Sequence, residues 1–389
     1  MAASLRAFCR VNSSLLKDAI TKKIFNDGSR SLFTQASLGL DGYINTRENV
    51  KRQFFNVEDN FRKKMKEFVD VETNMIFTED LKAMLHLAGK NTEDIDLITR
   101  MMIKFNTQNK ELRFGTYHFG PVVMRTLHYL DEPDTAFNLF FNPSLDGFFD
   151  QIVTYQILMD LLYNHKKYDD VKKVYDIIIT KGINGLKHPK YPVVLVLAAC
   201  YKQNTHESYE YAIKLWKELT DRGTVALRKA VALLGALALK QNAPHAALEI
   251  TSTIRRPGYI TIRCIKIAAL ANLDRVNDII PYFRASLSND NPNVRKESYF
   301  IDTIEQVEAA VQRANFDESS EIVKLLRQLK DNGHVQQSPM DEHLSQEIDS
   351  KQRETMNRYH SAFNDRGQHQ FQFNRRPTQQ HRSGLTGLV

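Results

Sequence analysis

The chain has 389 residues, of which 42% are hydrophobic, together with 11 prolines, 16 glycines and a formal net charge of +7. The apolar content suffices for a large core or a long stacked array, and the sparse proline and glycine favour helices over many short strands. The longest apolar run, residues 192–200, is about half as long as a membrane crossing requires. The modest basic excess fits a polyanionic partner, although a generally basic soluble protein explains it equally well.

The three cysteines, Cys9, Cys200 and Cys264, lie far apart and form no CxxC pair. They predict neither a disulfide framework nor a structural zinc site, and we expect no metal or other cofactor. Cys200 and Cys264 lie in apolar helical runs, which predicts that both are small core residues.

The first 40 residues carry the pattern of a mitochondrial transit peptide. Basic residues outnumber the acidic ones, Asp18 and Asp27, and serines recur. Apolar residues from Leu5 to Ile24 can share one helical face, which gives the amphipathic and acid-poor character of such peptides. A disordered basic N-terminus is the alternative. We expect import into the matrix and cleavage somewhere after Arg30, and residues 1–40 are left out of the predicted fold.

A repeated pattern runs through the middle of the chain, in which a small or β-branched residue is followed three and four positions later by apolar ones. This spacing places the side chains on one helical stripe, and the small residue lets a neighbouring helix approach closely. The marker residues lie 35, 41, 35 and 29 positions apart. They are Ala136, Val171, Ala212, Ala247 and Val276.

Each marker helix follows another apolar helical stretch, so the predicted unit is a helix, a turn and a helix. One such hairpin cannot bury its own apolar face, whereas stacked neighbours can. The sequence therefore predicts an all-α fold, a right-handed α-solenoid of stacked helix-turn-helix repeats. The predicted helix pairs are residues 78–88 with 92–105, 116–130 with the helix of Ala136, 154–163 with 169–180, 193–202 with 208–221, 226–240 with 244–254, 261–272 with 275–287, and 295–313 with 317–330.

The predicted array occupies residues 78–335 and is flanked by two segments of different character. Residues 41–77 form a charged lead-in, amphipathic over 42–71 and predicted to be helical from about Thr46. Residues 336–389 lose the periodicity and are rich in Gln, Ser, Asn and His, so we predict a mostly disordered polar tail.

One unit carries a specific family resemblance. Residues 153–160, VTYQILMD, and residues 163–183, YNHKKYDDVKKVYDIIITKGI, resemble a pentatricopeptide repeat. The VTY opening, the turn before Tyr168, the stripe of the second helix and the final Lys181-Gly182-Ile183 match the family pattern. The best repeat spans residues 153–187, and the looser resemblance covers most of residues 40–335.

The resemblance implies binding of single-stranded RNA through the first helix and the end of each repeat. Gln156 takes the base-facing position of the best repeat, where the family usually has Asn, Thr or Ser. The equivalent position of the next unit falls near Val194, which offers no hydrogen bond to a base. These departures favour binding through backbone charge, shape and a few stacked bases over base-by-base reading.

The candidate RNA contacts are polar or basic residues at repeat ends and at the starts of first helices. Their recurrence at similar positions is what a phosphate-tracking stripe requires, and a solvated surface charge is the alternative for each one. Tyr155 and Trp216 fall at packing positions and are predicted to be core residues. Residues 371–376 mix aromatics with arginines and are a further candidate for loose contact. The candidates are Gln156, Lys187, Lys190, Arg228, Lys229, Arg255, Arg256, Arg263 and Lys266.

The sequence favours a binding protein over an enzyme. It contains no Gly-rich phosphate loop, HExxH or GxSxG motif, so we expect no catalysis and no small-molecule substrate. The resemblance implies a factor for the processing, maturation or stability of mitochondrial RNA that supports respiratory-chain gene expression. It would work with a separate nuclease or a ribosome-associated protein. The alternative is a helical scaffold that grips another mitochondrial protein, such as an assembly factor.

Overall fold

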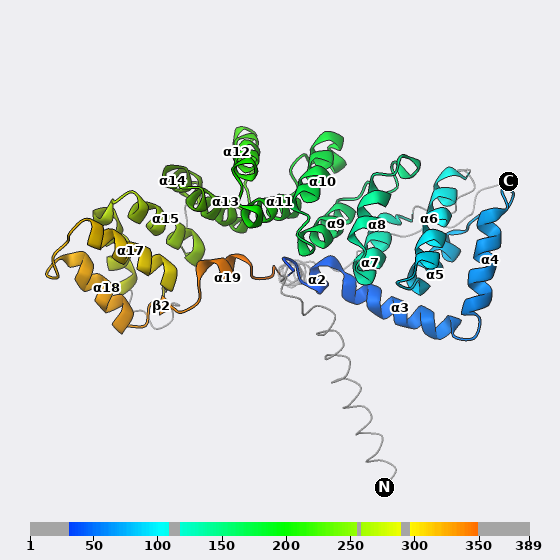
Figure 1. The fold of residues 1–389 in the computed structure, drawn as a ribbon, viewed down its shortest axis with the longest axis horizontal. Coiled ribbons are helices and arrows are strands. Elements are labelled where there is room, and N and C mark those ends of the chain that lie inside the picture. Colours follow the sequence, from blue (N-terminus) through cyan, green and yellow to red (C-terminus); the bar gives the residue numbers. More distant parts are fainter. Residues whose placement is uncertain (1–30, 109–116, 255–257, 289–295, 349–389) are drawn as a thin grey trace, which may run out of the picture. The chain divides into compact units, whose positions relative to one another are not determined.

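The structure, a computed structural model, describes residues 31–108, 117–254, 258–288 and 296–348. Within these ranges the chain is almost entirely helical, and the predicted all-α helical-repeat fold is confirmed (Figure 1). The described part begins with α2 (Gln35–Leu38), α3 (Leu40–Phe54) and α4 (Glu58–Asp70). No described helix has both the length and the apolar character needed to cross a membrane.

The array consists of helical hairpins, each made of a first or A helix and a second or B helix. The A helices are α5 (Thr78–Leu87), α7 (Gly120–Leu130), α9 (Ile152–Asn164), α11 (Lys190–Gln203), α13 (Arg228–Lys240), α15 (Ile260–Asn272) and α17 (Ile301–Arg313). The B helices are α6 (Thr92–Thr107), α8 (Pro133–Phe140), α10 (Tyr168–Lys181), α12 (His206–Asp221), α14 (Pro244–Ser252), α16 (Ile280–Leu287) and α18 (Glu321–Asp331). All the predicted helix pairs are found, and most ends are shifted by a few residues. The predicted helix of residues 295–313 begins only at Ile301, because Tyr299 and Phe300 form a short strand.

The A helices form the inner layer because each packs against the A helices before and after it. The central A helices, α9, α11, α13 and α15, are buried on almost all sides, and ten consecutive residues of α11, Pro192 to Tyr201, are buried. The A helices nearer the ends, α5 and α17, also carry charged residues. A helix that is hydrophobic all round must be covered on every face. The five marker residues are likewise at most 1% exposed; four lie in B helices, and Val276 lies in the short 3-10 helix η4 (Val276–Ile279) that leads into α16. Cys200 and Cys264 are buried as predicted.

The turn between the two helices of a hairpin has a recurring geometry. From α7 onward one residue of each A-to-B turn has a positive φ, between 49° and 60°. In several of these turns, the residue after the positive-φ residue donates its N–H to a carbonyl in the last turn of the A helix. Lys167, which follows Lys166, donates in this way to the Leu162 carbonyl at 3.0 Å. This is the left-handed helix cap, which Asn and Asp tolerate better than most residues. The turn residues are Asp131, Lys166, Asn204, Asn242, Asp274 and Asn315.

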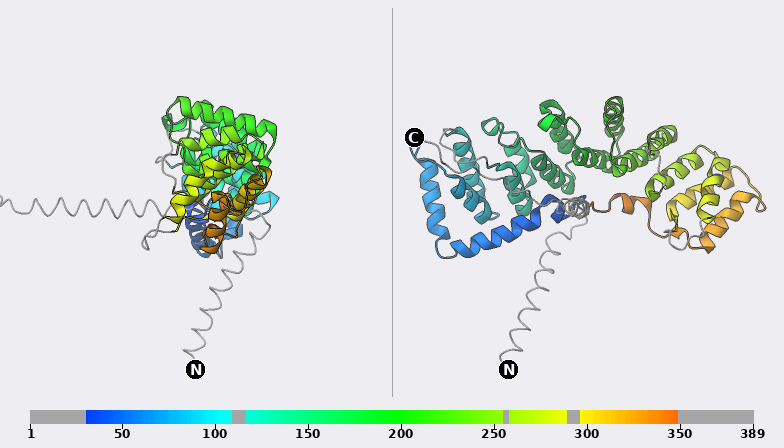
Figure 2. Two further views of the ribbon diagram at one scale, coloured as in Figure 1. Left: turned by 90° about the vertical axis from the view of Figure 1, so that its left-hand side faces the viewer. Right: turned by 180° about the vertical axis from the view of Figure 1, so that it is seen from behind.

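Segments from both ends of the described chain lie on the side of the A-helix layer that faces away from the B helices. We call this side the A-helix face. α2 contacts α9, and α3 contacts α5 and α7. The short α19 (Met340–Leu344) contacts α13, α15 and α17, after β2 (Val335–Gln336) has paired in parallel with β1 (Tyr299–Phe300). Figures 1 and 2 show α2, α3 and α19 on the same side of this layer.

The packed segments at both ends extend past two boundaries that the sequence predicts, the end of the transit peptide at residue 40 and the start of the polar tail at residue 336. Leu32, Phe33 and Leu38 are at most 2% exposed, although they fall in the predicted transit peptide of residues 1–40. Met340 and Leu344 are at most 9% exposed, although they fall in the predicted polar tail. Both segments are too short to show helical periodicity, which is why the pattern search excludes them. Residues 1–30 and 349–389 lie outside the described ranges.

Candidate nucleic-acid interface

The family resemblance places bound RNA on the A helices. In this structure α2, α3 and α19 of the same chain pack on the A-helix face and occupy part of that surface. Asp341 of α19 accepts a hydrogen bond from Tyr201 Oη at 2.7 Å. Its carboxylate also accepts from Lys202 Nζ at 3.3 Å and from Lys240 Nζ at 3.4 Å. Burial raises the pKa of this carboxyl, but the Tyr201 hydrogen bond and the lysine charges outweigh it, so the pKa is lowered. α19 thus neutralises cations of α11 and α13.

Lys229, a predicted RNA contact, also holds α19 in place. Its Nζ donates to the carbonyl oxygens of His343 at 2.9 Å and Gln346 at 3.2 Å. Burial lowers the pKa of Lys229 to about 8. In this arrangement the side chain is directed to the protein's own backbone and is not available to a phosphate.

Two further predicted contacts are buried. Gln156 is 8% exposed, because α9 is packed by α7, α8, α10, α11 and α2. Arg263 is 4% exposed; it forms an ion pair with Glu297 at 2.8 Å and donates to the Ser298 carbonyl at 3.1 Å. The sequence correctly places both residues on A helices, but only the tertiary packing reveals that their side chains are covered.

The remaining predicted contacts are exposed or outside the described ranges. Lys187, Lys190 and Arg228 are exposed, and Lys266 is half-buried. Arg255 and Arg256 lie outside the described ranges, as do residues 371–376. Tyr155 is fully buried and packs edge-on against Phe140 at 4.9 Å, in agreement with its predicted core role. Trp216 is half-buried.

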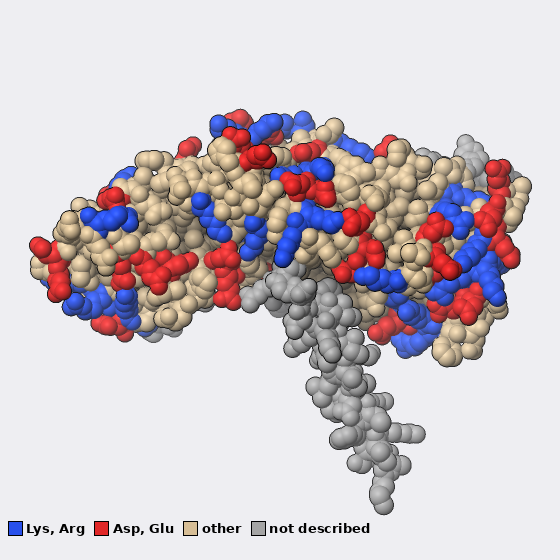
Figure 3. All heavy atoms as spheres, viewed as in Figure 1, with Lys and Arg blue, Asp and Glu red and all other residues tan. Residues whose placement is uncertain are grey.

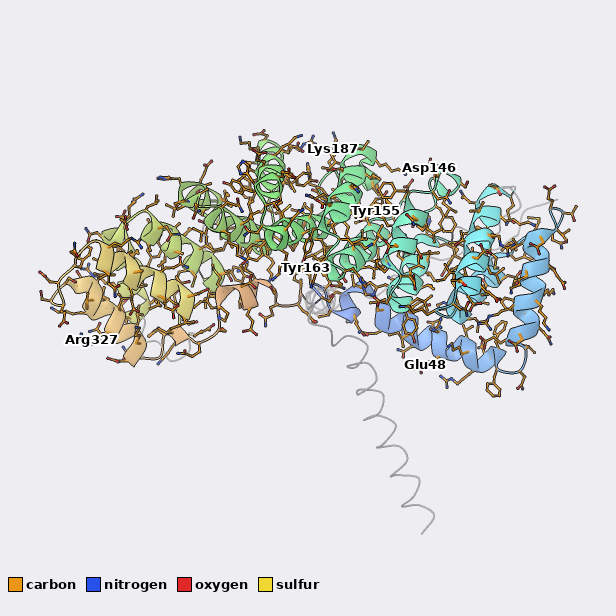
Figure 4. All side chains as sticks on the ribbon, viewed as in Figure 1. Glu48, Asp146, Tyr155, Tyr163, Lys187 and Arg327 are labelled. Carbon is orange, nitrogen blue, oxygen red and sulfur yellow. The ribbon has the colours of Figure 1, made fainter. Side chains whose placement is uncertain are left out.

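The exposed cations gather where one repeat ends and the next begins. Lys187 lies in the loop between α10 and α11 (Figure 4). His188 follows it, and Lys190 is the first residue of α11. Arg222 ends α12, and both Arg222 and Lys187 are close enough to lower the pKa of His188, after the larger effect of burial. Arg228 begins α13 and lies over the ring of Tyr259, 5.5 Å from its centroid, at the start of the next repeat. Successive loops are therefore neighbours.

We call this set, Lys187, Lys190, Arg222 and Arg228, the inter-repeat edge. Within the described residues none of the four forms an ion pair with a carboxylate, whereas Lys181 of the same repeat is paired with Asp146 and Asp150. Arg222 is absent from the predicted contacts. It precedes Gly223 as Lys181 precedes Gly182, and this shared repeat-end pattern is the sequence signal that would have identified it.

Apolar side chains alternate with these cations. Leu186 is 53% exposed beside Lys187, and Val225 is 81% exposed between Arg222 and Arg228. Exposed apolar groups beside cations can contact the faces of unpaired bases while the cations contact phosphates. Elsewhere on the face shown in Figure 3, Lys and Arg are intermixed with Asp and Glu. For binding a polyanion, the local group of cations at the inter-repeat edge is therefore a better indicator than the overall charge.

The tyrosine and histidine groups nearby are structural. His188 is 7% exposed, and its Nδ1 lies 2.9 Å from Tyr175 Oη. This contact joins the middle of α10 to the loop that carries Lys187. In the described part of the chain, no cluster of His, Cys, Asp and Glu side chains is placed to hold a metal ion.

The fold and this edge define a protein of stacked helical hairpins with cationic repeat ends, and comparisons with known proteins extend that description. No family model matches the sequence. The chain is 28% identical over 295 residues to the mouse (Mus musculus) protein called pentatricopeptide repeat-containing protein 2, mitochondrial, covering 72% of this chain and 76% of that one. The human (Homo sapiens) protein of that name is 29% identical over 286 residues, covering 70% and 71%.

The Xenopus laevis protein of the same name is 23% identical over 270 residues, covering 69% of this chain and 70% of that one. The chain thus resembles the pentatricopeptide repeat proteins along most of its length, as its best repeat predicts. It is similar in particular to pentatricopeptide repeat-containing protein 2, mitochondrial.

Proposed function

We propose that this protein is a non-catalytic RNA-binding factor of the mitochondrial matrix that acts in the processing or stability of mitochondrial transcripts. The names of its relatives support the mitochondrial location and the repeat type. The observation that carries RNA binding is the inter-repeat edge, with four exposed cations that have no carboxylate partner in the described residues. A flexible polyanion can follow successive loops in a way that a rigid duplex cannot.

In this proposal the RNA follows the edge and not the A-helix face. The phosphates contact Lys187, Lys190, Arg222 and Arg228, and unpaired bases rest against apolar side chains such as Leu186. Such contacts read little sequence, because base-specific recognition needs hydrogen bonds to base edges. Specificity for a transcript would then come from a partner, for which a separate nuclease or a ribosome-associated protein is our proposal.

Reversing the four charges of the edge to Glu tests this function directly. We expect affinity for a single-stranded oligonucleotide to fall at least tenfold. We also expect the log–log dependence of affinity on salt to lose about three units of slope, from about 0.7 per phosphate contact. Fluorescence anisotropy over a salt series measures both quantities, and ultraviolet crosslinking should yield adducts in the loops at residues 185–190 and 222–228.

A matched control reverses four exposed lysines elsewhere, Lys63 and Lys64 on α4 and Lys214 and Lys217 on α12. It makes the same change in net charge, so its affinity should stay within about twofold of the unmodified protein. Equal losses in the two variants would show that only overall charge matters and would remove the edge from the proposal.

A protein scaffold is the second candidate function. It is favoured by the same exposed apolar residues, since Leu186, Val225 and Phe141, all in loops between repeats, are 53%, 81% and 40% exposed. Exposed apolar groups in neighbouring loops are typical of a protein interface. A partner recovered with this chain that persists after ribonuclease treatment, together with absent RNA crosslinks, would establish the scaffold in place of RNA binding.

A further inference from the structure

A carboxylate is enclosed in the array where the N-terminal segment meets α9. Asp160 is 0% exposed. In the described part of the chain its ion-pair partner is His128, whose Nε2 lies 3.2 Å from Oδ2 and which carries a charge only when protonated, and no Lys or Arg side chain pairs with it. An ionised carboxylate without a compensating positive charge is costly to bury, so its surroundings must supply strong hydrogen bonds or a cation.

The two oxygens of Asp160 are unequally satisfied. Oδ2 has Asn164 Nδ2 at 3.1 Å and His128 Nε2 at 3.2 Å. Ser31 Oγ lies near both oxygens, 3.2 Å from Oδ2 and 3.4 Å from Oδ1, and among the described residues it is the partner of Oδ1. That hydroxyl has one proton, and it also lies 2.8 Å from the Phe33 carbonyl oxygen, a shorter and therefore better acceptor distance. Among the described residues, Oδ1 thus has one long contact, with Ser31 Oγ, and can accept a further hydrogen bond.

Ser31 is fixed at this point by the residues that follow it. Leu32 and Phe33 are each 1% exposed, and the Phe33 ring packs edge-on against Tyr191 of α11 at 5.6 Å. Thr34 then caps α2, accepting from the Ser37 N–H at 3.2 Å. Ser31 is therefore held beside α9 by the residues that follow it. Covalent geometry places the backbone nitrogen of Ser31 within about 4 Å of its own Oγ, which itself contacts the Asp160 carboxylate.

We propose that the precursor is cleaved between Arg30 and Ser31, and that the new α-ammonium group of Ser31 pairs with the buried carboxylate of Asp160. A processing peptidase adds water across the Arg30–Ser31 peptide bond, which leaves a carboxylate on Arg30 and an amine on Ser31. The amine is protonated at neutral pH, because its ordinary pKa is about 7.7 to 8.0. It adds a positive charge at neutral pH and a stronger donor than the Ser31 hydroxyl, so removal of the presequence completes the core around Asp160.

The cut position follows from packing on one side and charge on the other. Cleavage beyond Phe33 would remove buried side chains and leave a cavity between α2 and α11. Cleavage well before Arg30 would leave Ser31 as an uncharged amide. The basic residues that characterise the presequence, the last of them Arg30, lie before this bond.

The amine can be generated in vitro without any step of import. Replacing Asp27, Gly28 and Ser29 by Ile, Glu and Gly in the full chain creates an Ile-Glu-Gly-Arg sequence ending at Arg30, after which factor Xa cuts. We expect cutting to raise the Tm by about 2 to 4 °C. The rise should disappear in Asp160→Asn and persist in Asp96→Asn, a control at an exposed carboxylate of α6.

An equal Tm before and after cutting, or an equal rise in Asp160→Asn, would overturn the pairing. If Asp160→Asn does not fold, the pKa of the Ser31 amine in the cut protein decides, measured by NMR after selective isotopic methylation. A buried ion pair requires a pKa at least one unit above the ordinary value, whereas a value of 7.7 to 8.0 contradicts the proposal.

A second experiment tests the cut position in cells. The protein is isolated from mitochondria, and mass spectrometry identifies its first residue. A first residue of Ser31 supports the proposal, and a first residue elsewhere overturns the cut position. The inference rests on the proposed mitochondrial import. If import fails, the unprocessed chain is found outside the organelle. The factor Xa experiment still decides whether the Ser31 amine pairs with Asp160.

Discussion

At the scale of single residues, contacts between the N-terminal segment and the array are polar and buried. Arg47 of α3 donates to the carbonyl oxygens of His86 at 2.7 Å and Ala88 at 2.6 Å, where α5 ends. Tyr43 packs its ring against that of His86 at 4.9 Å and donates to the Leu85 carbonyl at 3.0 Å. Arg47 thus caps a helix end whose carbonyl groups would otherwise be unpaired.

This contact predicts a pH dependence of stability. Burial, and secondarily the charge of Arg47, lowers the pKa of His86 from 6.5 to about 4. Between these values the unfolded chain takes up a proton that the folded chain refuses, so the free energy of unfolding falls as the pH drops from 6.5 toward 4. We expect a loss of about 2 kcal/mol between pH 7 and pH 5, measured by urea unfolding.

The His86→Gln variant should lose most of that pH-dependent decrease. His206→Gln is the control, because His206 is exposed on α12 and pairs only with Glu210 at 3.2 Å. A decrease of the same size in His86→Gln as in the unmodified protein would show that other groups control the acid sensitivity.

At the scale of elements, α19 shows how a five-residue helix can be held. Isolated helices of this length do not form in water, so its stability comes from tertiary contacts. Met340 and Leu344 supply the buried apolar area, and Asp341 supplies the hydrogen bonds to Tyr201, Lys202 and Lys240. The ring of His343 adds a contact with Phe300 at a centroid distance of 5.3 Å.

Asp341→Ala should loosen α19 without unfolding the array. The variant loses the three hydrogen bonds of the carboxylate, which are worth about 1 to 2 kcal/mol together in a partly exposed site. We expect proteolytic cleavage within residues 336–347 to accelerate about tenfold. Limited proteolysis with mass spectrometry measures this rate. Glu347→Ala, which removes an exposed carboxylate from the same segment, should cleave at the original rate.

The prediction of elements from sequence succeeded where periodicity was long and failed where it was short. The hairpins from α5 to α18 repeat an i, i+3, i+4 pattern over many turns, and that pattern reports one buried face. α2 and α19 have fewer than two turns each and depend on partners distant in sequence, such as Asp160 for Ser31 and Tyr201 for Asp341. The left-handed turns at Asn204 and Asn242 agree with the residue type, because asparagine tolerates a positive φ.

At the scale of the whole molecule, each hairpin touches only its neighbours, so stability should be distributed along the array. Gly235 of α13 lies where such neighbours meet. A Cβ at this position would be 3.1 Å from Thr251 Cγ2 on α14 and 3.2 Å from Ile265 Cγ2 on α15. The absence of a side chain lets the three helices approach closely.

Gly235→Leu should therefore disrupt the array locally. A full side chain has no space between α14 and α15, and overpacking of this kind costs about 1 to 3 kcal/mol. We expect hydrogen exchange to accelerate in α13 to α15 and to remain unchanged in α5 to α7. Gly42→Leu is the matched control, because nothing lies within 4 Å of a Cβ at that position of α3. Uniform acceleration along the chain in Gly235→Leu would indicate a single cooperative unit.

The sequence by itself determined the helical-repeat fold, the order of the hairpins and the basic repeat ends, because these depend on periodicity and on residue type along the chain. Only the tertiary structure decided which of the predicted RNA contacts are accessible. Gln156, Lys229 and Arg263 are covered by neighbouring helices or by the chain's own end segments, while Lys187, Lys190 and Arg228 remain exposed. Burial depends on residues far apart in sequence, and a single sequence contains no local signal for those contacts.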